Sequence, residues 1–168
     1  ADVRLGEGSD TELPVGADLV VTSPGVPPWQ PLLAAAASSG VPIWSEVELG
    51  WQLQPDVGRP AWLTITGTNG KTTTVQMLSS ILAAAGERVA TVGNVGRPVV
   101  EAVCDPTPVD VFAVELSSFQ LHWTHSVSPV ASACLNLAPD HFDWYTGADG
   151  YRRYAADKGR VYERTQIA

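Results

Sequence analysis

The chain has few lysines and cysteines, and it lacks any long apolar run. Of its ten basic residues only two are lysine, and there are two cysteines among 168 residues. No stretch of 18 or more apolar residues occurs, so no membrane span is predicted. With 15 glycines and 13 prolines, the chain is too poor in both for a collagen-like or low-complexity protein. These absences leave a globular chain that is large enough to bury a core.

Positive charge is also scarce. The net charge is −8, from 18 acidic and 10 basic residues, and no cluster of lysine or arginine is present. A nucleic-acid-binding face needs such a cluster, so we expect no nucleic-acid partner. An anionic ligand would instead need backbone N–H groups at a helix start. Cys104 and Cys134 have neither metal-binding nor redox spacing, and we expect buried free thiols in a reducing compartment.

The chain opens on Ala1 without the basic and apolar leader of a secreted protein, and we expect a cytoplasmic protein of which this chain is a part. A segment rich in proline and glycine, residues 55–60, predicts a linker. It would separate one domain, which ends at residue 54, from a second domain over residues 61–168.

Apolar, β-branched segments alternate with segments of helical periodicity. Several of these segments are apolar throughout, which is typical of a parallel sheet covered by helices on both faces. In such sheets ligands bind at the carboxyl ends of the strands. Ser45 with Glu48 three residues later predicts a capping box. Strands are predicted at 17–22, 41–44, 61–66, 88–92, 109–116 and 129–137, and helices at 29–36, 45–53, 71–85, 97–104 and 148–163.

A glycine-rich turn follows the predicted strand at 61–66. It reads Gly-Thr-Asn-Gly-Lys-Thr-Thr over residues 67–73 and leads into a predicted helix. Glycines expose backbone N–H groups to phosphate, Lys71 adds a positive charge, and the hydroxyl of Thr72 can bind Mg²⁺. The usual spacing of such a phosphate loop requires glycine at position 65, where this chain has isoleucine. The alternative is a turn whose lysine faces solvent.

Two further strand ends carry polar side chains. Glu115 ends the apolar strand at 109–116, where a carboxylate beside a phosphate loop can hold Mg²⁺, although it can also be an ordinary strand-end residue. The strand at 129–137 carries Asn136 near its end and runs into Asp140, His141 and Asp143. They would meet Lys71 and Glu115 at one edge of the sheet, which favours a site there over scattered surface positions.

Lys158 lies on an otherwise apolar helix face. That face carries Tyr151, Tyr154, Ala155 and Tyr162 at helical spacing. The lysine can extend its ammonium into water along the apolar surface. It can also be held in a desolvated site, where burial favours the neutral amine. A neutral amine reacts with CO₂ to form a carbamate, which is an anionic oxygen ligand. Spacing alone favours the first interpretation.

Several segments together, in this order, resemble the Mur ligases. The loop over 67–73 is shared with several of these enzymes and with folylpolyglutamate synthases. The segment Glu-Leu-Ser-Ser-Phe-Gln-Leu is typical of a smaller group of enzymes. The segments that carry the resemblance are Ser23–Pro27, Thr66–Thr73, Gly93–Gly96, Glu115–Leu121, Asn136–Asp143 and Tyr154–Lys158.

The resemblance implies three domains, of which this chain would hold two parts. Residues 1–54 would be the C-terminal part of a Rossmann-like domain that binds a UDP-linked substrate. Residues 61–168 would be the N-terminal part of a central P-loop domain with a parallel sheet flanked by helices, which binds ATP. The segment Glu115–Leu121 is most similar to bacterial members that join D-glutamate to UDP-N-acetylmuramoyl-L-alanine in peptidoglycan synthesis. A monomer without a membrane span is expected.

The resemblance also implies roles for individual residues. ATP and two Mg²⁺ ions would be the cofactors, and the carbamate of Lys158 would become the favoured interpretation. Many relatives carry arginine after the residue matching Asp143, where this chain has Trp144. The implied ATP contacts are Gly67, Thr68, Asn69, Gly70, Lys71, Thr72 and Thr73; the metal ligands are Thr72, Glu115, His141 and Lys158; the catalytic residues are Lys71, His141 and Lys158; the UDP-substrate contacts are Ser23, Gly25, Asn94 and Gln120.

Three other functions stay open at this point. Another Mur ligase or a folylpolyglutamate synthase would share the loop but use a different substrate. A P-loop kinase or NTPase would hydrolyse or transfer phosphate without an amino-acid acceptor. A non-catalytic module would bind nucleotide only.

Overall fold

The computed structural model describes residues 3, 6, 8–55 and 57–168. It contains two parallel sheets, and the larger one has the strand order β4-β5-β3-β6. The predicted α/β class with a parallel, helix-flanked sheet is confirmed. The strands are β1 (Val20–Thr22), β2 (Ile43–Ser45), β3 (Ala61–Thr66), β4 (Val89–Gly93), β5 (Val111–Glu115) and β6 (Ala131–Cys134), and the helices are α1 (Pro31–Ser38), α2 (Glu46–Leu53), α3 (Lys71–Ala84), α4 (Val99–Cys104), α5 (Ser118–His122) and α6 (Gly150–Gly159), with a 3₁₀ turn at Arg160–Tyr162.

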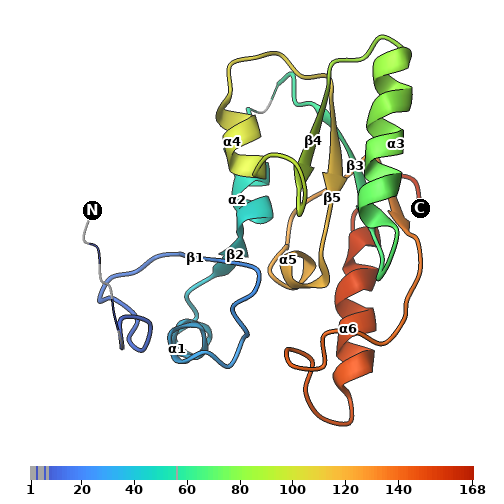
Figure 1. The fold of residues 1–168 in the computed structure, drawn as a ribbon. Coiled ribbons are helices and arrows are strands. Elements are labelled where there is room, and N and C mark those ends of the chain that lie inside the picture. The colour runs from blue at the N-terminus through green and yellow to red at the C-terminus, as the bar shows by residue number, and fades with distance from the viewer. Residues whose placement is uncertain (1–2, 4–5, 7, 56) are drawn as a thin grey trace.

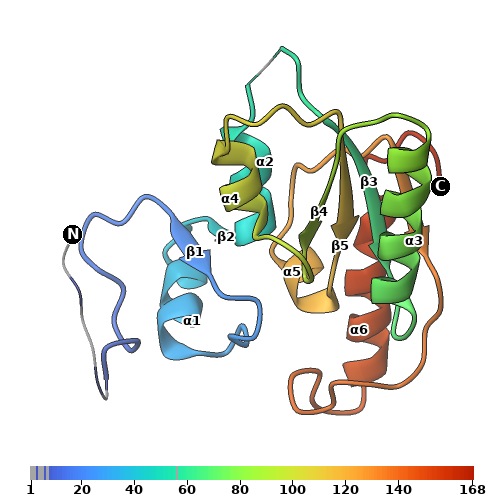
Figure 2. The ribbon, with the colours of Figure 1, turned by 45° about the horizontal axis from the view of Figure 1, so that its top comes forward.

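Side chains of alternating strand positions enter two separate cores. Trp62 and Phe112 pack with α2, α4 and α5, whereas Ile65 and Ala113 pack against α3 around Val75. This alternation follows from the two-residue period of a strand. Figures 1 and 2 show α2 and α4 on one face of the sheet and α3 on the other. The β4, β5, β3 and β6 strands are parallel, so their carboxyl ends open at the same edge, toward α5 and α6.

The small β1–β2 sheet contacts the larger unit through α2 and the segment after α5. The backbone N–H of Ser45 donates to Trp123 O at 2.9 Å, and the Ser45 hydroxyl lies 3.1 Å from that of Thr124. The carboxylate of Glu48, 1% exposed, accepts from the backbone N–H groups of His125 and Ser126 at 2.7 and 3.0 Å. These bonds fix α2 against the chain that follows α5.

This use of Glu48 corrects the predicted capping box. The Ser45 hydroxyl caps α2 by accepting from Glu48 N at 3.1 Å, but the Glu48 carboxylate does not return to Ser45. A complete capping box occurs instead at α5, a helix that the sequence analysis did not predict, between Ser117 and Gln120. Five-residue α5 is too short to show helical periodicity in the sequence.

Several predicted boundaries are also wrong. β6 is shorter than the apolar segment 129–137, because the chain after Cys134 runs along the phosphate loop, where Asn136 O accepts from Thr68 N at 3.1 Å. The last helix narrows to a 3₁₀ turn after Gly159.

Cys104 is exposed at the end of α4 and Cys134 is half-buried, so the expectation of two buried thiols is wrong.

Within the part of the chain that the structure describes, no helix combines the length and the apolar character needed to cross a bilayer.

We predict that Glu48→Ala lowers the free energy of unfolding by about 2–4 kcal/mol, because it leaves half-buried N–H groups of His125 and Ser126 without an acceptor. Burial raises the pKa of Glu48, but hydrogen bonds from Ser126 and His125 outweigh it and hold the pKa below 4.5. A depressed folded-state pKa means that the wild-type advantage is present above about pH 4.5 and declines as the pH falls. Urea unfolding at pH 7 and pH 3 measures both effects. The exposed Glu12→Ala serves as control, and equal stabilities of the two variants at pH 7 would contradict the prediction.

Candidate functional site

The phosphate loop joins the carboxyl end of β3 to the first turn of α3. Gly70 is the N-cap residue with φ 82°, and no side chain caps this helix start. The backbone N–H groups there are therefore oriented for an anion, at the positive end of the helix dipole. Asn136 braces the loop, because its side chain accepts from Asn69 N at 2.9 Å and donates to Asn69 O at 3.0 Å. Ile65 is a core residue of β3 and is 5% exposed. The position where a phosphate loop usually has its first glycine is therefore still part of the strand in this chain.

The Lys71 ammonium lies over this loop, where its Nζ donates to Thr68 O at 3.0 Å. The hydroxyl of Thr68 lies 2.8 Å from that of Tyr154, which links the loop to α6. The positive charge of Lys71 therefore lies at the phosphate loop. The alternative, a lysine directed into solvent away from the loop, does not fit this contact. Thr73 is exposed on the first turn of α3.

Through its carboxylate, Glu115 joins the end of β5 to the start of α3 and to the residue that follows β4. It is 1% exposed, and it accepts from the hydroxyl of Thr72 at 2.9 Å and from the side-chain amide of Asn94 at 2.8 Å. The backbone N–H of Asn94 donates to Glu115 O at 2.8 Å. A buried carboxylate beside a hydroxyl is a set of hard oxygen donors, which fits Mg²⁺. In the described part of the chain, no three His, Cys, Asp or Glu side chains gather into a metal cluster.

Lys158 is buried under the phosphate loop, so the water-directed alternative is wrong. Its side chain is 2% exposed, and Nζ donates to Gly67 O at 2.8 Å and to Thr66 Oγ1 at 3.4 Å. Desolvation, followed by the charge of Lys71, lowers the pKa of Lys158 to about 8. Burial therefore favours the neutral form of this amine more than it would for an exposed lysine.

His141 is more exposed than Lys158. Its side chain is 41% exposed, its ring centroid is 4.7 Å from that of Phe119, and its backbone has φ 54°. Both residues lie near the Tyr154 ring, whose centroid is 6.1 Å from that of His141 and 4.9 Å from Lys158 Nζ. Trp144, at the position where relatives often carry arginine, is 6% exposed and packs against Phe119 and Trp29.

A cavity of about 490 Å³ brings together three of the four predicted substrate residues, Ser23, Asn94 and Gln120. Gly25 does not line it. Glu46, which the sequence analysis missed, lines the same cavity, and its carboxylate accepts from Val100 N at 2.6 Å. Burial raises the pKa of Glu46. The only sequence signal was its place at the start of a helix, where acidic residues are common for capping reasons alone.

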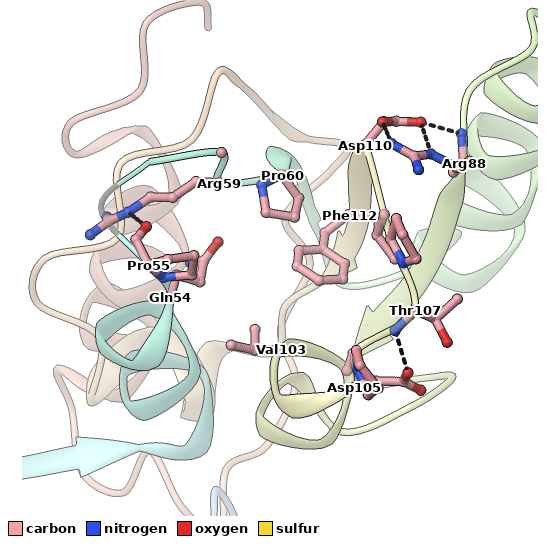
Figure 3. A pocket seen from close by; sticks show the side chains of 15 residues that line it. Gln54, Pro55, Arg59, Pro60, Arg88, Val103, Asp105, Thr107, Asp110 and Phe112 are labelled. Carbon is pink, nitrogen blue, oxygen red and sulfur yellow. Dashed lines mark hydrogen bonds and ion pairs between the residues drawn. The ribbon is translucent and has the colours of Figure 1, made fainter.

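A different cavity, of about 480 Å³, lies at the opposite edge of the sheet (Figure 3). Asp110 accepts there from Arg88 N at 2.9 Å and from its guanidinium, and these bonds hold the pKa of Asp110 at about 2. Gln54 and Phe112 also line this cavity. None of the predicted site residues does, so it is separate from the phosphate loop.

The parallel sheet, the glycine-rich loop after β3 and the acidic residue at the end of β5 define a P-loop α/β domain. Residues 65–167 match the family model of the Mur ligase middle domain, and the chain belongs to the Mur ligase family. The resemblance found in the sequence is thereby confirmed.

Two curated relatives of the chain carry the same name. The chain is 56% identical to a UDP-N-acetylmuramoylalanine–D-glutamate ligase of Streptomyces coelicolor, over 99% of this chain and 35% of that protein. It is 52% identical to the protein of the same name from Frankia casuarinae, over 98% of this chain and 33% of that protein. The chain thus spans about a third of the length of these relatives.

Solved structures of the family share the fold. A UDP-N-acetylmuramoyl-L-alanyl-D-glutamate–2,6-diaminopimelate ligase matches with a TM-score of 0.57 and 22% identity, over 89% of this chain and 39% of that one. The UDP-N-acetylmuramate–alanine ligase of Thermotoga maritima matches with a TM-score of 0.52 and 21% identity, over 89% and 34% of the two chains.

We predict that Gly93→Ala destabilises the chain more than Gly86→Ala does. Both glycines have positive φ, 101° and 95°, so both substitutions carry backbone strain of about 1 kcal/mol. A Cβ on Gly93 would lie 2.3 Å from Glu115 O, whereas one on Gly86 would meet nothing within 4 Å. The difference between the two losses of unfolding free energy, measured by urea titration, should exceed about 1.5 kcal/mol. Equal losses would show that β4 and β5 separate freely at this end.

Proposed function

We propose that this chain is part of an ATP-dependent ligase that joins D-glutamate to UDP-N-acetylmuramoyl-L-alanine in the bacterial cytoplasm. The observation that carries the proposal is the meeting of the phosphate loop, the buried carboxylate of Glu115 and the buried amine of Lys158 at one edge of the sheet. The curated relatives of this name support the choice of substrates. In this proposal residues 1–54 belong to the UDP-substrate domain, 55–60 are the linker and 61–168 belong to the ATP domain of a monomer.

The phosphate loop would hold ATP through residues 67–73. Its N–H groups and the ammonium of Lys71 would neutralise the transferred phosphoryl group. Thr72 and Glu115 would hold one Mg²⁺ ion, and their contact at 2.9 Å supports a shared ligand set. Bound Mg²⁺ would supply charge neutralisation between the nucleotide phosphates and the substrate carboxylate.

Lys158 would act as its carbamate. An ammonium cannot ligate a cation, but the neutral amine favoured by burial can attack CO₂ and lose a proton to form an anionic carbamate. This group and His141 would hold a second Mg²⁺ ion. The position of both residues around Tyr154 supports this assignment.

The UDP-linked substrate would bind at the cavity between β1 and α5. Ser23, Asn94 and Gln120 would contact it, and Gly25 would contribute from the neighbouring turn. Asn94 also donates to Glu115, so the substrate contact and the metal site share one side chain.

The reaction would then proceed in two steps, phosphoryl transfer and amide formation. A carboxylate oxygen of the alanyl group attacks the γ-phosphorus, the bond to the β–γ bridging oxygen breaks, and ADP leaves. The amine of D-glutamate attacks the resulting acyl phosphate at carbon, an amide bond forms, the amine loses a proton, and inorganic phosphate leaves. The loop, Lys71 and His141 would keep the two anionic reactants close.

The test uses the whole protein that carries this chain. Release of ADP and phosphate should require UDP-N-acetylmuramoyl-L-alanine, and amide product should form with D-glutamate but not with L-glutamate. Lys71→Met should reduce kcat by at least about 100-fold, because the charge on the transferred phosphoryl group loses its partner. The exposed Arg152→Met serves as the matched control. ADP release with no acceptor would indicate an NTPase, and a preference for another amino acid would indicate another ligase of the family.

A second prediction concerns the amine of Lys158. Because its folded-state pKa of about 8 lies below the ordinary 10.5, folding disfavours its protonated form. In protein kept free of CO₂, the free energy of unfolding should therefore rise with pH between about 8 and 10.5, relative to Lys158→Met. With ¹³C-bicarbonate, a carbamate signal in the ¹³C NMR spectrum should grow as the pH rises toward 8.5 and be absent in Lys158→Met. In the whole protein, Lys158→Ala should lose most activity without rescue by bicarbonate. A wild-type spectrum without this signal would refute the carbamate.

A further inference from the structure

A buried carboxylate next to Lys158 has no part in the proposed reaction. Asp157 is 8% exposed on α6, and one of its oxygens, Oδ2, has two partners. The hydroxyl of Tyr145 donates to it at 2.9 Å, and His122 Nδ1 lies 2.8 Å from it. Burying a carboxylate is costly unless it is hydrogen-bonded, so this arrangement requires both neighbours to stay in place.

The two partners come from the elements that flank the candidate site. His122 ends α5, the helix that carries Gln120. Tyr145 closes the turn that begins at His141, because its backbone N–H donates to His141 O at 2.8 Å. Asp157 therefore ties α6 both to α5 and to the His141 turn.

Close packing makes this connection rigid. A Cβ on Gly150, at the start of α6, would lie 1.9 Å from Tyr145 O, so the turn presses directly on the helix. The Tyr145 ring stacks on Phe119 with centroids 6.1 Å apart, and the Trp144 ring meets that of His122 edge-on at 5.0 Å. The aromatic groups fill the space around the carboxylate, and the two hydrogen bonds set the rotation of α6 within it.

That rotation determines where Lys158 lies relative to His141. Both residues lie near the Tyr154 ring, and Lys158 donates to Gly67 O from its present position on α6. We propose that Asp157 is a positioning residue, which holds the His141 turn against α6 so that His141 and Lys158 can bind one cation. This inference rests on the proposed function, because it assumes the metal site that His141 and Lys158 would form.

Binding of Mn²⁺ in place of Mg²⁺ tests the proposal without relying on activity. Mn²⁺ is titrated by EPR into the whole protein with a non-hydrolysable ATP analogue and bicarbonate present. The site formed by Lys158 is identified as the one that Lys158→Ala abolishes. Asp157→Leu, which removes both hydrogen bonds at similar size, should weaken that site by about 10–100-fold and leave the other site unchanged. Asp157→Asn, whose amide oxygen can still accept both bonds, should restore most of the affinity.

Two further variants complete the design. Tyr145→Phe removes one hydroxyl and keeps the ring, so it decides the question if circular dichroism shows that Asp157→Leu is unfolded; it should weaken the same site several-fold. Asp149→Asn changes a carboxylate at the N-cap of the same helix, where it makes no capping hydrogen bond, and should bind Mn²⁺ like wild type. Unchanged affinity of the Lys158 site in folded Asp157→Leu or in Tyr145→Phe would overturn the positioning role. Absence of that site in wild-type protein would instead refute the second metal of the proposed function.

Discussion

The buried carboxylate of Glu115 is the contact on which the arrangement of the site depends. Its oxygens accept from Thr72 at the start of α3 and from Asn94 after β4, and the chain then turns into α5. One side chain thereby connects the ends of three elements that the parallel sheet brings to a single edge. A carboxylate buried to this degree must be hydrogen-bonded, so its partners cannot move independently. The same requirement keeps a hydroxyl and a carboxylate next to each other, as a cation site needs.

The helix α6 completes the site from below the sheet edge (Figure 2). It is attached to the phosphate loop by Lys158, which donates to Gly67 O, and by Tyr154, whose hydroxyl meets that of Thr68. These bonds place an amine in a poorly solvated position, and desolvation is the main cause of its lowered pKa. The position that supports the fold of the loop is thus also the one that favours a reactive neutral amine.

The sequence predicted the elements with strong local signals. The loop over residues 67–73, the strands around it and Glu115 follow from patterns within a few neighbouring residues, and the structure has them at one edge. The sequence could not predict α5, because five residues give no helical period. The capping box of Ser117 and Gln120 is recognisable only beside a known helix. The end of β6 was misplaced for a related reason: Leu135 and Leu137 are apolar, but this segment runs along the phosphate loop, where Asn136 bonds to Thr68 and Asn69. Glu48 was assigned to a local cap and instead binds a segment nearly 80 residues away.

By itself, the sequence determined the fold class and the phosphate loop, because alternating periodicity and glycine spacing depend only on neighbouring residues. The family followed from the resemblance of several segments, in their order, to the Mur ligases. Tertiary structure decided the environment of Lys158, for which helical spacing favoured a water-directed ammonium and the family resemblance favoured a desolvated amine. It also decided that Ser23, Asn94 and Gln120 share a cavity with Glu46, and that Asp157 faces Tyr145 and His122. Such outcomes depend on which residues from distant segments come into contact, and burial and hydrogen bonding arise only from those contacts.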